Sequence, residues 1–189
     1  MQIIPDLNLE LANQWILLTI YFVVFIVFVF RLSKEKREWL FEDPKQMMHG
    51  WKKLTLRAGQ LLAFIIIILL CFTRLPVKIL GFEFIGMVLY LTGVFLVPLS
   101  LHYFGKAPLD QPVLDGPYRY SRNPQWVGLF MVLFGLAILA DSILLVILVT
   151  LVGLSYHIQI LGEEEICRAK YGASYEEHLK TVPRYLIFK

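Results

Sequence analysis

The sequence predicts an all-α, polytopic membrane protein with about five transmembrane helices. Of its 189 residues, 58% are hydrophobic, and the mean hydropathy is +0.65. A soluble domain is nearer half apolar. The apolar residues also gather in runs close to the ~20 residues that one helical crossing needs. The net charge of +3 is too small to indicate a nucleic-acid partner.

The first three spans are expected at Leu11–Phe30, Leu54–Phe72 and Phe82–Tyr103. Between the first two, Arg31–Lys53 mixes charges with aromatic and methionine side chains. This mixture fits a loop or short helices in the headgroup zone, and it fits a solvated loop equally well. Pro76 ends the second span, because proline cannot continue the helical hydrogen-bond ladder.

The last two spans are expected at Gln125–Ala140 and Ile143–Leu161. Asp141 and Ser142 between them predict a tight turn, so these spans form an antiparallel hairpin.

Two pairs of glycines have a spacing of seven residues, which places each pair on one helical face. They are Gly86 with Gly93 and Gly128 with Gly135. Glycine faces let helices approach closely in membranes. We expect the first pair to admit a neighbouring helix and the second to bring the hairpin spans into close backbone contact.

The C-terminal part is polar from Gly162 onward. Gly172 is expected to end the preceding helix. Ser174 is expected to cap a short helix, with Glu177 completing a capping box, and Pro183 to stop it.

Charge predicts the orientation. All lysines and arginines except Arg74 and Lys78 fall on one side of the predicted topology. Cytoplasmic loops carry the basic excess, so the N-terminus is expected outside and the C-terminus in the cytoplasm.

Two polar segments meet on that cytoplasmic side. Asp115–Gly128 precedes the hairpin and Glu163–Glu165 follows it, so the hairpin brings them together. Ionisable groups at a membrane boundary indicate a functional site.

Structural roles alone also fit several of these residues. The glutamates suit a solvated helix end, and Asn123-Pro124 suits a helix start. Tyr118, Tyr120 and Trp126 suit interfacial anchors.

Several chemistries lack their motifs. The sequence has no GxGxxG fingerprint, no P-loop and no GxSxG elbow. The four scattered histidines do not have zinc-site spacing, and no metal is expected.

The polar segments together resemble a known family. The motif runs Gly116-x-Tyr118-x-x-x-Arg122-Asn123-Pro124-x-Trp126-x-Gly128, then Glu163-Glu164, then Tyr171-Gly172-x-x-Tyr175 and Val182-Pro183-Arg184. It is similar to the C-terminal half of isoprenylcysteine carboxyl methyltransferases, whose wider group includes membrane phospholipid N-methyltransferases. The resemblance covers about Leu101–Lys189. It implies a single domain, 1–189, with three spans in 1–103 and a catalytic half in 104–189.

The resemblance implies an S-adenosylmethionine-dependent methyltransferase without a Rossmann domain. Glu163, Asn123 and Arg122 would serve catalysis, and Arg184 would help close the pocket. The implied cofactor-binding residues are Gln111, Pro112, Val113, Leu114, Tyr118, Asn123, Pro124, Gln125, Trp126 and Glu163.

Two residues depart from the family pattern. Asn123 stands where the family usually has His, and Trp126 where it usually has Tyr. Asn cannot titrate, which argues against an obligatory general base there. A carboxylate acceptor is already ionised at pH 7 and needs no base.

The cofactor's charges suit these residue types. The faces of Tyr118 and Trp126 favour its sulfonium cation, and Glu163 could bind its ammonium. Backbone N–H groups at the start of the fourth span could take its carboxylate.

The expected reaction is methyl transfer to the carboxylate of a lipid-modified, isoprenylcysteine-like acceptor at the membrane–cytoplasm interface, with membrane lipids as surroundings. Two alternatives remain: N-methylation of an amine headgroup by the same fold, and a non-enzymatic membrane transporter or scaffold. Transporters usually place polar residues mid-span. The first, second and fifth spans lack an ionisable residue near their centres.

Overall fold

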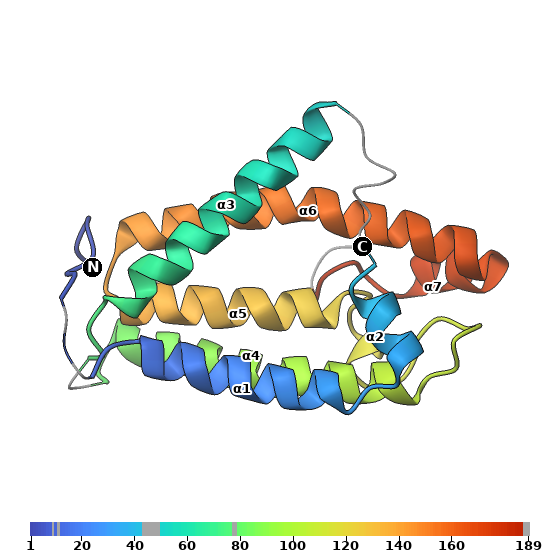
Figure 1. The fold of residues 1–189 in the computed structure, drawn as a ribbon, viewed down its shortest axis with the longest axis horizontal. Coiled ribbons are helices and arrows are strands. Elements are labelled where there is room, and N and C mark those ends of the chain that lie inside the picture. The colour runs from blue at the N-terminus through green and yellow to red at the C-terminus, as the bar shows by residue number, and fades with distance from the viewer. Residues whose placement is uncertain (9, 11, 43–49, 77–78, 187–189) are drawn as a thin grey trace.

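The chain folds into a bundle of helices that lie along one long axis (Figure 1). The structure is a computed structural model that describes residues 1–8, 10, 12–42, 50–76 and 79–186. Its helices are α1 (Trp15–Phe30), α2 (Lys34–Leu40), α3 (Trp51–Cys71), α4 (Phe82–Lys106), the 3₁₀ turn η2 (Gly116–Arg119), α5 (Pro124–Leu139), α6 (Ile143–Tyr171) and α7 (Ala173–Thr181).

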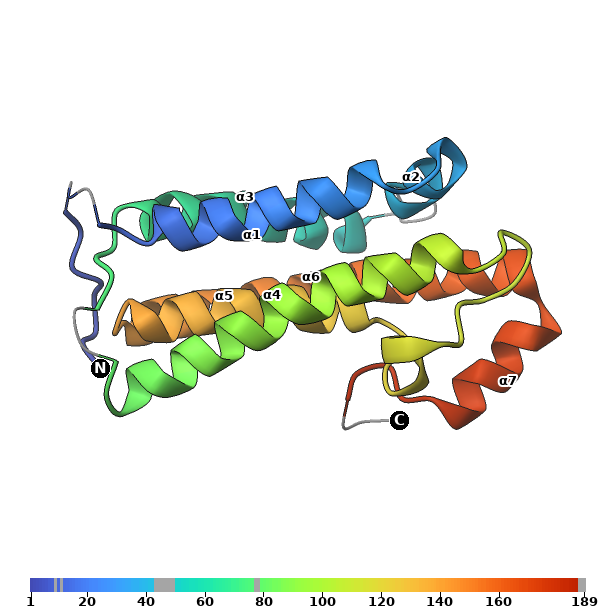
Figure 2. The same ribbon diagram turned by 90° about the horizontal axis from the view of Figure 1, so that it is seen from below.

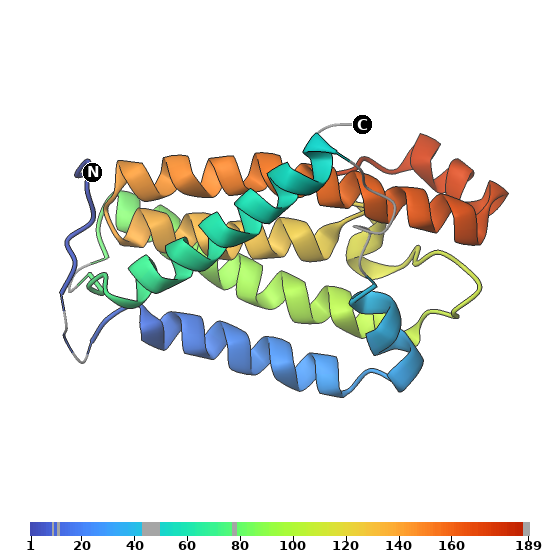
Figure 3. The same ribbon diagram turned by 45° about the horizontal axis from the view of Figure 1, so that its top comes forward.

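The long helices form two layers. Figure 2 shows α1 and α3 in one layer and α4, α5 and α6 in the other. Figure 3 shows α3 crossing obliquely over α6. Gly59 permits that crossing, since a Cβ there would overlap the Cβ of Ser155. Buried apolar side chains from both layers form a single core cluster.

The predicted fold class is confirmed: the protein is all-helical and polytopic. Among the described helices, α3, α4 and α6 are long and apolar enough to cross a membrane, while α1 and α5 are apolar but only 16 residues long. The predicted first span was too long at its start. Asn13 pairs with Arg74 in an isolated β-bridge, and the backbone N–H of Gln14 donates to the Thr73 carbonyl. The helix therefore begins at Trp15.

The glycine pairs join α4 to α5, which corrects the expectation for the hairpin. A Cβ on Gly93 would lie 2.5 Å from the Gly128 carbonyl oxygen, and one on Gly135 would lie 2.7 Å from the Gly86 oxygen. Close approach for Gly86 and Gly93 is therefore confirmed. The predicted close contact between α5 and α6 through Gly128 and Gly135 was wrong, because these glycines face α4.

Gly93→Ala should destabilise the protein by about 1–3 kcal/mol, because the added methyl overpacks a backbone contact. Its Cβ would also meet Val132 Cγ2 at 2.8 Å. The measurement is the unfolding midpoint in detergent. Gly153→Ala is the matched control, because its Cβ would make ordinary 3.5 Å contact with Phe130. Equal midpoints for both variants would contradict the packing role.

The polar segments follow the predicted pattern in part. The segment after α1 contains the short helix α2, which Ser33 caps by accepting from the Lys36 amide. Predicted features at Pro44, Met47 and Met48 lie outside the described residues, as does Lys78.

The C-terminal helix starts earlier than predicted. Gly172, with φ of 55°, ends α6 as expected. The same glycine is also the N-cap of α7, whose first helical residue is Ala173. The prediction that Ser174 is the N-cap was therefore wrong. The Ser174 hydroxyl instead donates to the Tyr171 carbonyl oxygen at 2.9 Å.

One end of the bundle, here called the site end, carries α2, η2 and α7 (Figure 1). Both predicted polar segments lie there. At the opposite end, residues 1–8 tie the loops together: the Gln2 amide donates to the Asp141 carbonyl and the Asn8 amide to the Phe72 carbonyl.

Candidate active site

A cavity of about 480 Å³ lies between the two layers and reaches the site end. Its inner walls are apolar and come from α1, α3, α4, α5 and α6. Its outer walls are more polar and come from η2, the start of α5, the end of α6, α7, and the end of α2 with the two residues after it. The cavity therefore joins a polar compartment to a hydrocarbon-lined one.

Most of the residues predicted for the site line this cavity. They are Pro112, Val113, Tyr118, Arg122, Asn123, Pro124, Gln125, Trp126 and Glu163. Gln111 and Leu114 do not line it and are exposed. The loop before η2 thus turns its two middle predicted residues inward and its two outer ones to the surface.

Glu163 is fixed in the cavity wall by two hydrogen bonds. The indole N–H of Trp126 donates to its Oε2 at 2.8 Å, and the Gln159 amide donates to its Oε1 at 3.0 Å. Gln159 is four residues earlier on the same helix, so both side chains lie on one face. The carboxylate is held in one orientation while remaining part of the cavity lining.

Tyr118 is held in a similar way. Its hydroxyl accepts a hydrogen bond from Gln125 at 2.9 Å. Burial raises the pKa of Tyr118, so it remains a neutral phenol at physiological pH.

Three aromatic rings form a cluster in the cavity wall, and one of them, Trp126, is hydrogen-bonded to Glu163. The centroid of the Trp126 ring is 5.1 Å from that of Tyr156 and 6.5 Å from that of Phe130, and the latter two are 6.4 Å apart. All three side chains line the cavity. Aromatic faces beside a carboxylate provide a site suited to an organic cation.

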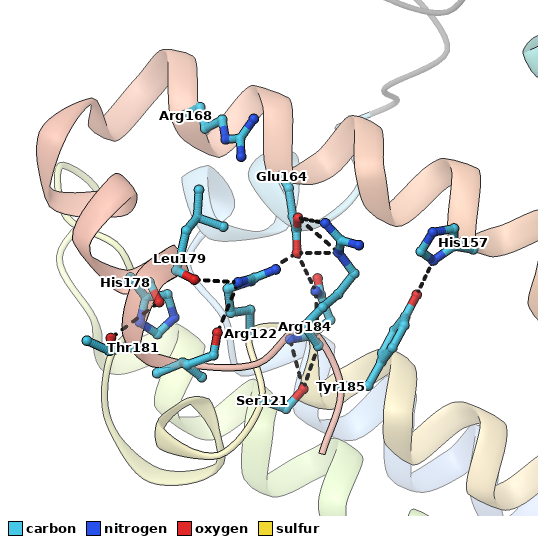
Figure 4. Close-up of polar contacts among 12 residues, drawn as sticks. Ser121, Arg122, His157, Glu164, Arg168, His178, Leu179, Thr181, Arg184 and Tyr185 are labelled. Atoms are coloured by element: carbon cyan, nitrogen blue, oxygen red, sulfur yellow. Dashed lines mark hydrogen bonds and ion pairs between the residues drawn. The ribbon is translucent and has the colours of Figure 1, made fainter. Parts of the chain in front are cut away.

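Glu164, the next residue, serves a different purpose (Figure 4). Its carboxylate accepts from Arg122 Nε at 3.1 Å and from Arg184 Nη2 at 2.9 Å. The side chains of Glu164 and Arg122 are only 4% and 5% exposed. Glu164 thereby joins α6 to the start of α5 and to the C-terminal segment.

Arg122 has its Nε and Nη1 donors committed to the protein. Beyond Glu164, its Nη1 donates to the carbonyls of Leu179 at 3.0 Å and Val182 at 2.9 Å (Figure 4). We therefore assign Arg122 to holding the site together, and its predicted catalytic role stays untested.

Asn123 occupies the N-cap position of α5, and Pro124 is the first helical residue, as predicted. The Asn123 side chain makes no capping hydrogen bond. It donates instead to Glu164 Oε1 at 3.2 Å and to the Arg184 carbonyl at 3.4 Å. The amide of Asn123 thus belongs to the Glu164 cluster.

Sequence reasoning missed His178 as a cavity residue. It is 6% exposed and lies one helical turn after Tyr175, which also lines the cavity. Burial, aided by the charge of Arg122, lowers the pKa of His178, although Glu164 opposes this shift. A neutral imidazole can accept a proton. The spacing of two buried rings on α7 was the available sequence signal.

No group of three or more His, Cys, Asp or Glu side chains that could hold a metal ion occurs in the part of the chain that the structure describes.

Comparison with known proteins identifies the family. The family model described as phospholipid methyltransferase matches residues 62–174. No curated protein matches the chain, and no solved structure does. The matched region extends from α3 to the start of α7 and contains both polar segments, and it covers more than half of the sequence. The protein therefore belongs to the phospholipid methyltransferase family and is a membrane methyltransferase.

Proposed function

We propose that the protein transfers the methyl group of S-adenosylmethionine to a lipid-anchored acceptor at the cytoplasmic face of the membrane. One observation carries this proposal: a single cavity joins the polar site-end residues to the apolar space between the layers. A polar cofactor and a lipid can therefore meet within one continuous cavity.

The residues present fit the cofactor. Glu163 offers a carboxylate for its ammonium, beside the ring cluster of Trp126, Phe130 and Tyr156, which suits its sulfonium. The amides of Gln125 and Trp126 lie in the first turn of α5, where a helix has no internal acceptor for its N–H groups. Such amides can bind the cofactor's carboxylate. When bound, the cofactor would supply an electrophilic methyl group.

The acceptor we propose is a carboxylate on a lipid-modified, isoprenylcysteine-like group. Asn123 cannot titrate, and its amide is engaged with Glu164 and the Arg184 carbonyl. An ionised carboxylate needs no proton acceptor at this position. The chain's contribution is then to align the two reactants and to exclude water.

An amine headgroup is the second candidate, favoured by two observations. The matching family model is described by phospholipid methylation. A neutral, buried His178 lines the cavity and could accept the proton that an ammonium acceptor must lose.

The charge distribution supports the cytoplasmic placement. Lysines and arginines gather at the site end, in α2, around η2 and in the C-terminal segment, as the positive-inside rule requires of cytoplasmic segments. The C-terminus would then lie in the cytoplasm.

Calorimetry with S-adenosylhomocysteine on the purified protein tests the cofactor. We expect saturable binding. No binding up to about 1 mM, which corresponds to a free energy weaker than about −4 kcal/mol, would contradict the proposal.

Labelled methyl transfer to membrane lipids then identifies the acceptor. Label released by mild base as volatile methanol indicates a carboxyl ester, and label that stays in a non-volatile methylated amine after base treatment indicates the amine headgroup.

A further inference from the structure

The inner part of the cavity contains a tyrosine hydroxyl without a protein partner. Tyr21 of α1 is 7% exposed and lines the cavity, and its hydroxyl makes no hydrogen bond with any residue that the structure describes. Two other buried tyrosines, Tyr90 and Tyr118, are paired. The Tyr90 hydroxyl donates to the Leu17 carbonyl at 2.7 Å, and the Tyr118 hydroxyl accepts from Gln125.

The surroundings of Tyr21 are hydrocarbon. Its ring stacks on Phe25, with centroids 6.2 Å apart, and meets the edge of Phe22 at 5.5 Å. Ile66 and Val97 line the same cavity. The hydroxyl is not among the polar atoms that the described residues enclose completely without a hydrogen-bond partner, so it remains accessible from the cavity. A phenylalanine would fill this wall equally well, which leaves the hydroxyl available to a ligand.

Tyr21 also lies well below the polar compartment. It is nine residues before Phe30, the end of α1 nearest the site, which corresponds to a helical rise of about 13 Å. An acceptor whose headgroup reacts beside Glu163 would therefore place its lipid portion near Tyr21.

We propose that the Tyr21 hydroxyl donates a hydrogen bond to a carbonyl oxygen of the bound lipid, below the reacting headgroup. Tyr21 is then a specificity-determining residue. A lipid with a carbonyl satisfies the hydroxyl, and a lipid without one leaves it unpaired, which penalises the wrong substrate. This inference rests on the proposed lipid occupancy of the cavity.

Two lipids carry such an oxygen: an acyl glycerolipid, in its ester carbonyl, and an N-acylated prenylcysteine, in its amide carbonyl. The test uses each of them with a matched analogue that lacks the carbonyl. The analogues are the ether-linked glycerolipid and the prenyl thioether acid in which a neutral alkyl ether replaces the N-acyl group, because reducing the amide carbonyl would create a charged amine.

Tyr21→Phe should lower kcat/KM for the carbonyl-containing acceptor about 2- to 13-fold, the factor that corresponds to one hydrogen bond of 0.5–1.5 kcal/mol. It should leave the carbonyl-free analogue unchanged, so that the wild-type preference disappears. The pair that loses its preference identifies the source of the carbonyl. Tyr90→Phe is the matched control: it should lower the unfolding temperature and keep the preference.

An equal loss on both members of each pair, or a preference that survives in Tyr21→Phe, would overturn the inference. If the wild type transfers methyl to none of the four acceptors, the proposed function fails instead. In that case the test of Tyr21 is a binding measurement: the amounts of ester lipid and ether lipid that stay bound to the purified wild type and to Tyr21→Phe are compared. A preference for the ester lipid in the wild type alone supports the inference. Equal binding of the two lipids by both proteins overturns it.

Discussion

Glu163→Ala should abolish methyl transfer, whereas Glu165→Ala should reduce it only mildly. Glu163 lines the cavity and is oriented by Trp126 and Gln159. Glu165 is exposed and does not line it. Truncating one partner of a buried charge pair with a ligand costs about 2–5 kcal/mol, which is roughly a 30- to 4000-fold loss of affinity.

The measurement compares transfer rates and S-adenosylhomocysteine affinity for the two variants at equal folded concentration. Glu163→Gln is informative as well, because an amide oxygen can still accept the Trp126 hydrogen bond while the negative charge is gone. We expect its affinity to lie between those of wild type and Glu163→Ala. Equal activity of the two alanine variants would show that the cofactor does not use Glu163.

The two neighbouring glutamates show what a sequence can and cannot predict. The motif placed a Glu-Glu pair at the end of the last span, beside the Asn123 segment, and the structure places both there. Successive residues on a helix point about 100° apart, from 3.6 residues per turn. The two carboxylates therefore find different partners although both residues line the cavity: Glu163 accepts from Trp126 and Gln159, and Glu164 accepts from Arg122 and Arg184. Which glutamate meets which partners depends on the rotation of α6 against its neighbours.

The glycine pairs also show what the sequence could predict and what it could not. A spacing of seven predicted correctly that Gly86 and Gly93 share a close-packed face. It could not name the partner helix. The chain order suggested that Gly128 and Gly135 face α6, the next helix, but they face α4 across the loop at 107–123.

Local and long-range effects explain the remaining differences. Ser174 failed as an N-cap because Gly172 both ends α6 and begins α7, which leaves no position for a separate cap. Tyr21 and His178 gave no site motif. Their places in the cavity wall arise from the packing of α1 over the second layer and of α7 against the site end.

Glu164→Ala should destabilise the protein by about 3–5 kcal/mol, because it leaves the buried guanidinium of Arg122 without its counter-ion. It also removes the acceptor for Arg184 and Asn123, so the C-terminal segment loses its attachment to α6. Unfolding in detergent measures the effect. Glu176→Ala is the matched control, because it removes the exposed ion pair with Arg168, at 3.3 Å, for less than about 1 kcal/mol. If Glu164→Ala and Glu176→Ala have the same unfolding midpoint, the Glu164 cluster does not stabilise the site. A large shift in midpoint, with S-adenosylhomocysteine affinity retained by the folded fraction, would separate this structural role from the ligand-binding role that we propose for Glu163.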